Sequence, residues 1–233
     1  MTFRPRDWAG SPAFLDAGYC STEFRGPKQP LIALPQGVGE TSGPAFGRQW
    51  VTPRNADLTR NGRSNGEPVG ERIVVTGRVV DEDGHPLPAT LIEIWQANAA
   101  GRYAHQADAH DAPLDPNFEG VGRVLTDDRG WYKFQTIKPG AYPWRNHPNA
   151  WRPNHIHFSL FGPAFATRLI TQMYFPGDPL LELDPIFKSV PDAAARARLV
   201  ARFEIAETIA EVALGYRFDI VLRGNFETPL QPE

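Results

Sequence analysis

Two histidines stand two residues apart in the segment RPNHIHFSLFG, residues 152–162. The apolar residues around them predict a β-strand, and side chains two positions apart on a strand point to the same face. His155 and His157 could therefore hold one metal ion between them. They could equally be polar residues of a solvent-facing strand, because paired surface histidines are common. A metal site here needs further ligands from elsewhere in the chain.

The remaining residues offer several candidates for those ligands. Cys20 is the single cysteine, which excludes a zinc site built from thiolates. His147 precedes a proline and could serve, whereas His105 and His110 fall in a polar loop and His85 in a turn. An Asp or Glu could instead complete a site of two histidines and one carboxylate for Fe(II). Residue types alone do not choose among these alternatives.

The elements that must position the histidines are predicted to be short β-strands. The chain holds 23 prolines and 21 glycines, and their spacing divides it into short segments, as in turn-rich β proteins. The segments ERIVVTGRVVD, ATLIEIWQAN, HIHFSLFG, ATRLITQMYF and YRFDIVLRG each predict a strand, and GRVLTDDRGWYKFQTIKPG predicts a hairpin that turns at TDDRG. In the second of these, alternation puts Glu93 and Trp95 on one face and Ile92 and Ile94 on the other.

One segment is typical of a helix instead. PDAAARARLVARFE has Asp192 as a candidate N-cap, followed by good helix formers and by apolar residues at helical spacing. We therefore expect a mainly β fold, an antiparallel β-sandwich with a long irregular N-terminal arm and one short helix in its C-terminal half.

The chain is predicted to have two parts. Residues 1–70 carry prolines, glycines and asparagines where regular elements would have to continue, yet they keep many aromatic and aliphatic residues. Such a segment is expected to be an arm that packs on the core or on a partner chain. Residues 71–233 are expected to form the β-sandwich domain.

Charge and hydropathy exclude some classes of partner. The 233-residue chain has a formal net charge of −3, which gives no support for binding nucleic acid or anionic lipid. No apolar run approaches the roughly 18 residues of a membrane span. The N-terminus lacks the apolar stretch of a secretory signal, and with a single cysteine we expect a cytoplasmic protein.

Several long motifs resemble the intradiol aromatic-ring dioxygenases, and chiefly the iron-bearing β chains of the members that cleave protocatechuate. These motifs are LIEIWQANAAGRYAH, PLDPNFEGVGRVLTDDRGWYKFQTIKPGAYPWRN, WRPNHIHFSLFG and TRLITQMYFPGDPL, with STEFRGPKQPLI in the leader and YRFDIVLRG near the end. The resemblance implies one non-haem Fe(III) per chain, held by two tyrosines and two histidines. The family's GRY and KPGxYP tyrosines fall on Tyr103 and Tyr142, and its RPxHIH histidines fall on His155 and His157. The expected metal thereby changes from zinc or Fe(II) to Fe(III).

The same motifs imply roles for residues around the iron. Arg152 and Gln172 resemble the groups that act on the reacting oxygens and on the charge of the substrate, and Tyr142 resembles the ligand that leaves the iron when substrate binds. The substrate-binding residues implied are Tyr19, Trp144, Arg145 and Ile186, the first and third near the ring carboxylate and the other two as pocket walls.

The resemblance implies an enzyme that opens protocatechuate with O2 to 3-carboxy-cis,cis-muconate, in the β-ketoadipate pathway of aromatic catabolism, and that pairs with an α chain. One alternative is a catechol or hydroxyquinol 1,2-dioxygenase, but those relatives carry a helical N-terminal region and this leader is rich in proline. Another is an α-type chain, which would lack the iron ligands. A third, from a different class, is a β-sandwich binding module whose histidine pair traps metal incidentally.

Overall fold

The computed structural model describes residues 10–13, 15–21, 27, 29, 51–62, 65–148, 150–161, 169–222 and 224–231. Most of the arm predicted at residues 1–70 lies outside these residues. Within the part of the chain that the structure describes, no helix is long and apolar enough to cross a membrane.

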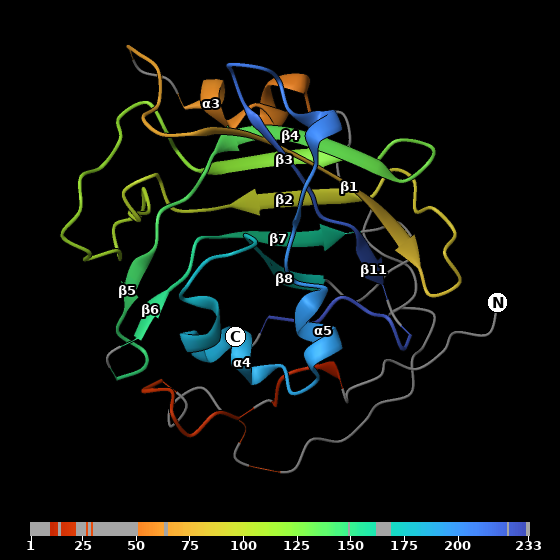
Figure 1. The fold of residues 1–233 in the computed structure, drawn as a ribbon. Helices are drawn as coiled ribbons and strands as arrows, with labels where there is room; N and C mark the ends of the chain where they lie inside the picture. The colour runs from red at the N-terminus through yellow and green to blue at the C-terminus, as the bar shows by residue number, and fades with distance from the viewer. Residues whose placement is uncertain are drawn as a thin grey trace.

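Two β-sheets and a hairpin form the body of the molecule (Figure 1). The first sheet contains β1 (Arg72–Asp81), β4 (Trp131–Ile137), β9 (Arg202–Phe203), β10 (Leu214–Arg217) and β11 (Ile220–Leu222). The second has the order β3-β2-β7-β8, with β3 (Val121–Leu125), β2 (Leu91–Trp95), β7 (His155–Phe161) and β8 (Leu169–Tyr174). The hairpin is β5 (Tyr142–Trp144) with β6 (Ala150–Arg152).

The predicted mainly β fold is confirmed, and the structure adds a detail of strand direction. The second sheet is antiparallel throughout, as expected. In the first sheet β1 pairs antiparallel with β4 but parallel with β10 and β11, so this sheet is mixed. Parallel pairing requires a long crossover connection, and all four strands of the second sheet lie in the chain between β1 and β10.

The helices among the described residues are short. They are η3 (Pro53–Ala56), α3 (Leu58–Asn61), η4 (Leu181–Leu183), α4 (Pro185–Ser189), α5 (Ala193–Ala197) and η5 (Ile205–Glu207). The expected helix is α5, and Asp192 caps it by accepting from the backbone N–H groups of Ala194 and Ala195. It ends earlier than its sequence pattern predicts, because Leu199 and Ala201 form backbone hydrogen bonds with Tyr174 at the end of β8.

Among the described residues, the C-terminal half therefore contains two short α-helices where one helix was expected. The second, α4, begins at a proline and is capped by Asp184, whose carboxylate accepts from the backbone N–H groups of Ile186 and Phe187. A helix of five residues is too short to show an apolar periodicity, so the pattern that predicted α5 could not predict α4.

The main core lies between the two sheets. Ile92 and Ile94 of β2 and Ile156 and Phe158 of β7 are fully or almost fully buried there, so the face of β2 that carries Ile92 and Ile94 is the inner one. His155 and His157 alternate with these residues and so face the other side of the second sheet. Figure 1 shows α4 and α5 on the β8 side of that sheet. There a smaller apolar cluster covers it, formed by Tyr174, Phe187, Val190, Ala195 and Leu199.

Candidate metal centre

The two histidines lie on the outer face of the second sheet, yet they are buried. His155 is 1% exposed and His157 is 7% exposed, and their ring centroids are 4.8 Å apart. The register of the sheet sets their neighbours, since His157 lies opposite Trp95 of β2 and stacks on its ring at 4.8 Å with an angle of 7°. The reading of the pair as solvent-facing decoration is therefore wrong for this strand.

Two tyrosines meet the histidines from other parts of the chain. The Tyr103 oxygen lies 3.1 Å from Nε2 of His157, and the Tyr142 oxygen lies 3.2 Å from Nε2 of His155. The two phenol rings pack edge to face with centroids 5.5 Å apart. The structure thus brings together the four residues that the family resemblance implies as iron ligands.

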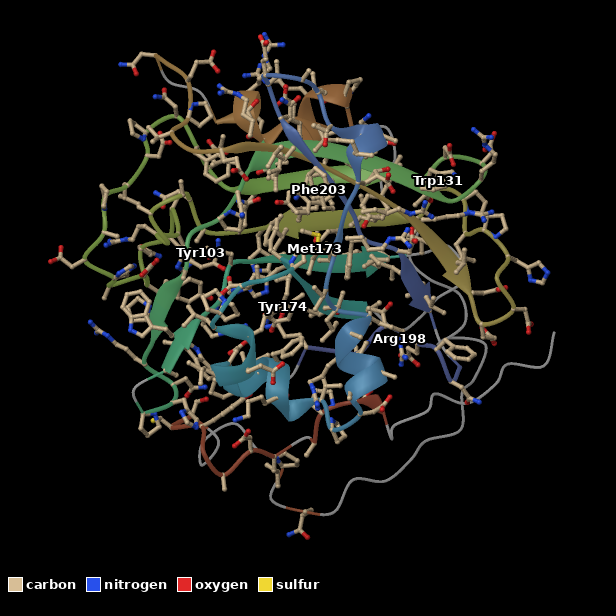
Figure 2. The ribbon with its side chains drawn as sticks, in the orientation of Figure 1. Tyr103, Trp131, Met173, Tyr174, Arg198 and Phe203 are labelled. Atoms are coloured by element: carbon tan, nitrogen blue, oxygen red, sulfur yellow. The ribbon has the colours of Figure 1, made fainter. Side chains whose placement is uncertain are left out.

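The loop after β2 carries Tyr103 to this position. The Asn98 side chain accepts from the backbone N–H groups of Ala100 and Arg102, which closes a tight turn. Gly101 has a φ of 77°, and a Cβ there would lie 2.1 Å from the Ala141 carbonyl oxygen. The turn can therefore lie directly against the chain that precedes Tyr142. Figure 2 labels Tyr103 at the end of the sheet where β5 lies.

Burial sets the charge state of these groups. It lowers the pKa of His157 to about 3, and it holds the pKa of His155 well below its usual value together with the Arg152 charge. Both imidazoles are therefore neutral near pH 7, as metal ligation requires. Burial also raises the pKa of Tyr103 and of Tyr142, so both phenols keep their protons until a cation favours the phenolate form.

The four side chains fit a metal ion such as ferric iron. Nδ1 of each ring faces an acceptor, the Pro153 carbonyl at 2.6 Å for His155 and the Gln231 amide oxygen at 2.8 Å for His157. Nε2 of each ring is left facing a phenol oxygen. Two imidazole nitrogens and two potential phenolates in one place suit a hard trivalent cation, because anionic oxygen donors offset its charge.

The alternative ligand sets are not assembled. Among the described residues no group of three or more His, Cys, Asp and Glu could hold a metal ion. His85 is exposed and lies 3.2 Å from Asp81, and His147 faces the carbonyl of its neighbouring proline. His105 is exposed, and His110 faces the Gly101 carbonyl at 3.0 Å. The alternative of two histidines with one carboxylate therefore finds no support among the described residues.

Arg152 lies beside the four residues and is almost fully buried. Its Nε donates to Asp184 at 2.9 Å, and its guanidinium also donates to Gln172 and to the Tyr174 hydroxyl. Burial opposes its charge, but the surrounding phenols and the Asp184 carboxylate raise its pKa, so the cation persists. The guanidinium lies 5.6 Å from the Trp144 ring centroid.

Sequence reasoning missed Asp184 and Tyr174. The Tyr174 hydroxyl donates to Gln172 at 2.9 Å or to Asp184 at 3.1 Å, and it also accepts from Arg152. The register of β7 with β8 explains the arrangement, because Tyr174 lies opposite His155 and Gln172 lies opposite His157. The motif DPIF, an N-cap residue followed by proline, was the signal that could have identified Asp184.

The expected substrate-binding residues fall in different surroundings. Tyr19 is buried against Trp144, with ring centroids 5.0 Å apart at 86°, and burial, with Asp16 adding, raises its pKa to about 12. Ile186 is buried on α4, in a small hollow that it shares with Gln172 and Tyr174. Arg145 is exposed.

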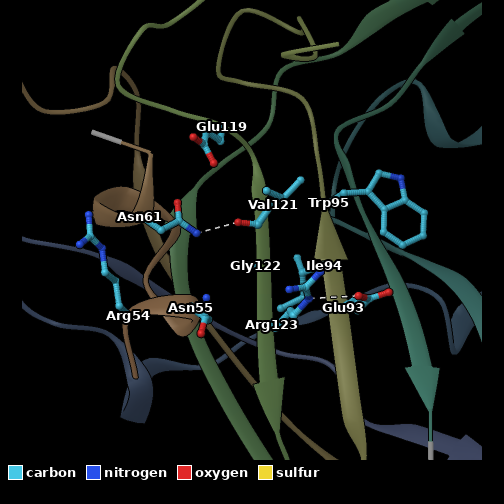
Figure 3. A pocket seen from close by; sticks show the side chains of 10 residues that line it. All are labelled: Arg54, Asn55, Asn61, Glu93, Ile94, Trp95, Glu119, Val121, Gly122 and Arg123. Carbon is cyan, nitrogen blue, oxygen red and sulfur yellow. Dashed lines mark hydrogen bonds and ion pairs between the residues drawn. The ribbon is translucent and has the colours of Figure 1, made fainter. Parts of the chain in front are cut away.

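A pocket of about 480 Å³ opens onto the centre and is lined by Trp95, Gln96, Tyr103, Ala104, His105, Asp108, Glu119, Gly120, Val121, Tyr142 and His157. Figure 3 shows a neighbouring pocket of about 400 Å³, which shares Trp95, Glu119 and Val121 with the first. In it Arg123 pairs with Glu93 at 3.1 Å, and the Asn61 amide donates to the Val121 carbonyl at 2.7 Å. Its polar groups thus serve mainly to join α3 and the strands.

The chain matches two family models, one described as Dioxygenase over residues 41–224 and one as Protocatechuate 3,4-dioxygenase beta subunit N terminal over residues 4–37. It is 60% identical over 227 residues to a protocatechuate 3,4-dioxygenase beta chain from Burkholderia cepacia, across 97% of this chain and 96% of that one. A protocatechuate 3,4-dioxygenase alpha chain from Pseudomonas putida is 30% identical, across 85% of this chain and 97% of that one. The crystal structure of 3-chlorocatechol 1,2-dioxygenase from Rhodococcus opacus 1CP has the same fold, with a TM-score of 0.53 and 24% identity over 68% of this chain and 62% of that one.

Proposed function

The chain belongs to the intradiol ring-cleavage dioxygenases, which use non-haem iron, and we propose that it opens protocatechuate (3,4-dihydroxybenzoate) with O2 to give 3-carboxy-cis,cis-muconate. The observation that supports protocatechuate as the substrate is the 60% identity, over nearly the whole of both chains, to a protocatechuate 3,4-dioxygenase beta chain. Ring opening occurs between the two carbons that bear hydroxyl groups, and both atoms of O2 enter the product.

Tyr103, Tyr142, His155 and His157 would hold one Fe(III) per chain. Their convergence supports this assignment, because each histidine nitrogen Nε2 lies within 3.2 Å of a phenol oxygen. Bound there, ferric iron would draw electron density from the substrate diol and make its ring reactive toward O2. The buried, neutral imidazoles add no charge, so the phenolates carry the negative charge that the cation requires.

Protons and developing charge are handled by the chain's own groups. The Tyr142 oxygen would accept a proton of the substrate diol, because burial raises the pKa of this phenol and so favours its protonated form. Arg152 stabilises the negative charge that develops on the substrate, and its hydrogen bonds to Asp184 and Gln172 hold the guanidinium in one orientation.

The substrate ring binds beside Trp144 and Ile186, with Tyr19 and Arg145 near its carboxylate. Trp144 contacts both the Tyr19 ring and the Arg152 guanidinium. These contacts support the proposal that the three side chains form one wall of the substrate site. An α chain is the proposed partner, because the B. cepacia relative is a beta chain and an alpha chain is also similar to this sequence. Residues 1–70 are then an arm that packs on the core or on that partner, and residues 71–233 carry the iron site.

An optical spectrum of the purified protein tests the metal assignment. The iron-loaded protein should be coloured, because tyrosinate bound to Fe(III) absorbs visible light. The double variant Tyr103→Phe, Tyr142→Phe should lose this absorption. A colourless iron-loaded protein, or undiminished colour in the double variant, would contradict the assignment.

Oxygen consumption tests the substrate. We expect turnover of protocatechuate to exceed that of catechol, measured with and without a co-produced α-type chain. A preference for catechol would instead make the chain a catechol 1,2-dioxygenase.

A further inference from the structure

The C-terminal segment, residues 224–231, returns to the second sheet after β11. Thr228 and Val221 exchange two hydrogen bonds, Thr228 N to Val221 O at 2.9 Å and Val221 N to Thr228 Oγ1 at 3.0 Å. The Thr171 hydroxyl of β8 then donates to the Pro229 carbonyl at 2.7 Å. Thr228 and Pro229 are buried. The segment is therefore docked on β8 by specific contacts.

Its last described residue reaches the candidate metal centre. The Gln231 backbone N–H donates to the Ile170 carbonyl at 2.8 Å, which fixes the main chain beside β8. The Gln231 amide oxygen lies 2.8 Å from Nδ1 of His157, a residue 74 positions earlier in the chain. On the other side of the same ring, Nε2 faces the Tyr103 oxygen at 3.1 Å.

The hydrogen-bond partner of Nδ1 matters because a neutral imidazole carries one proton on either nitrogen. An acceptor at Nδ1 favours the tautomer whose proton is on Nδ1, and this leaves the lone pair of Nε2 free. His155 obtains such an acceptor locally, from the Pro153 carbonyl at 2.6 Å. For His157 the acceptor at Nδ1 among the described residues is the distant Gln231, while Trp95 stacks on the face of the ring.

We propose that Gln231 is a positioning residue of the metal centre, whose amide oxygen holds His157 in the tautomer protonated at Nδ1 and so presents Nε2 to the metal. The inference rests on the proposed function, because it takes His157 to be an iron ligand. It assigns a role in the site to the C-terminal segment, which must dock on β8 before His157 is oriented. Partners of this kind typically change metal affinity by roughly 10- to 100-fold when they are removed.

Matched variants at one position test the proposal in the full-length chain. Gln231→Leu removes the acceptor at similar volume, whereas Gln231→Glu keeps an acceptor. Asn225→Ala, an exposed residue of the same segment, is the control for general effects on the tail. Thermal unfolding of each metal-free variant first establishes that it folds, and Gln231→Ala replaces the leucine variant if that one does not.

Two readouts then report on His157. In the metal-free protein at neutral pH, ¹⁵N NMR of the imidazole should show the Nδ1-protonated tautomer in wild type, Gln231→Glu and Asn225→Ala, and a mixture in Gln231→Leu. Loss of ferric iron to a chelator, followed by the fading visible absorption, should be roughly 10- to 100-fold faster in Gln231→Leu. In Gln231→Glu the rate of iron loss should stay close to that of the wild type.

The outcomes separate this inference from the proposed function. An unchanged tautomer in Gln231→Leu, or iron loss at the wild-type rate, overturns the role of Gln231 and leaves the iron site intact. A wild-type protein that binds no iron overturns the proposed function and, with it, the metal-positioning role. Equal loss of iron in Gln231→Leu and Gln231→Glu would mean that the side chain acts only by packing, which also contradicts the proposal.

Discussion

Arg152 carries a buried positive charge, and its energetics depend on its partners. The Asp184 carboxylate is fully buried, and it accepts from the Arg152 Nε, from the Tyr174 hydroxyl and from two backbone N–H groups at the start of α4. Removing one member of a buried ion pair leaves the other charge without compensation. The same pair therefore holds the guanidinium beside the candidate ligands and fixes the start of the helix that carries Ile186.

Replacing Arg152 by methionine tests this coupling. We expect Arg152→Met to lower the free energy of unfolding by about 3–5 kcal/mol, because Asp184 then remains buried and unpaired. Denaturant unfolding of the metal-free chain measures the change. Arg145→Met is the matched control at an exposed position and should change stability by less than about 0.5 kcal/mol. Equal, small effects of both substitutions would mean that the Arg152–Asp184 pair contributes little to the fold.

At the scale of elements, the centre is built where a turn, a hairpin and a strand meet. The turn after β2 brings Tyr103, the strand β5 brings Tyr142, and β7 brings the two histidines. The contact between the turn and the segment before β5 is close only because residue 101 is glycine, with a φ of 77° and space for hydrogen alone. This contact determines whether the two phenols can meet.

Alanine substitutions at two glycines of similar conformation, Gly84 and Gly101, distinguish the effect of backbone strain from the effect of the close contact between residue 101 and Ala141. Gly84 has a φ of 82° and no heavy atom within 4 Å of a built Cβ, so Gly84→Ala should cost only about 1–2 kcal/mol for the left-handed conformation. Gly101→Ala should lower the free energy of unfolding by about 1–3 kcal/mol more than Gly84→Ala does, because its Cβ overlaps the Ala141 carbonyl. Thermal unfolding measures both.

Gly101→Ala should also weaken iron binding, since it pushes Tyr103 away from Tyr142, and Gly84→Ala should leave the visible absorption unchanged. If both variants lose the same stability and keep the same colour, the close approach of the turn does not position Tyr103.

At the scale of the whole molecule, the hydrophobic core and the candidate metal centre lie on opposite faces of the second sheet. One face of the second sheet packs in the sandwich core, while the opposite face carries the candidate metal centre and, beside β8, packs against α4, α5 and the C-terminal segment. The sheet can thus hold the ligands in register, because the strand that presents them is anchored on its other face.

Production of the chain alone and with an α-type partner tests the proposed partnership. We expect the isolated chain to be poorly soluble or inactive, because an arm rich in apolar residues would lack the surface on which it packs. Co-production should give a soluble, active hetero-oligomer, measured by size-exclusion chromatography and oxygen consumption. An isolated chain that behaves as an active monomer would contradict this expectation.

The sequence by itself determined the local features of this protein. Alternation within a strand put Ile92 and Ile94 on one common face and His155 and His157 on another, and Asp192 was recognisable as a helix cap. These features follow from steric and hydrogen-bonding rules that act between residues two to four positions apart. The long motifs then identified Tyr103 and Tyr142 by resemblance, which no local rule could do.

Only the tertiary structure decided which distant segments meet. Tyr103 reaches a histidine 54 positions away, Arg152 pairs with Asp184 across 32 positions, and Gln231 meets His157 across 74. The parallel pairing of β1 with β10 and β11 is of the same kind. Such contacts depend on sheet register, on the packing of loops and on the path of the chain end, and these are set by the whole core rather than by any one segment.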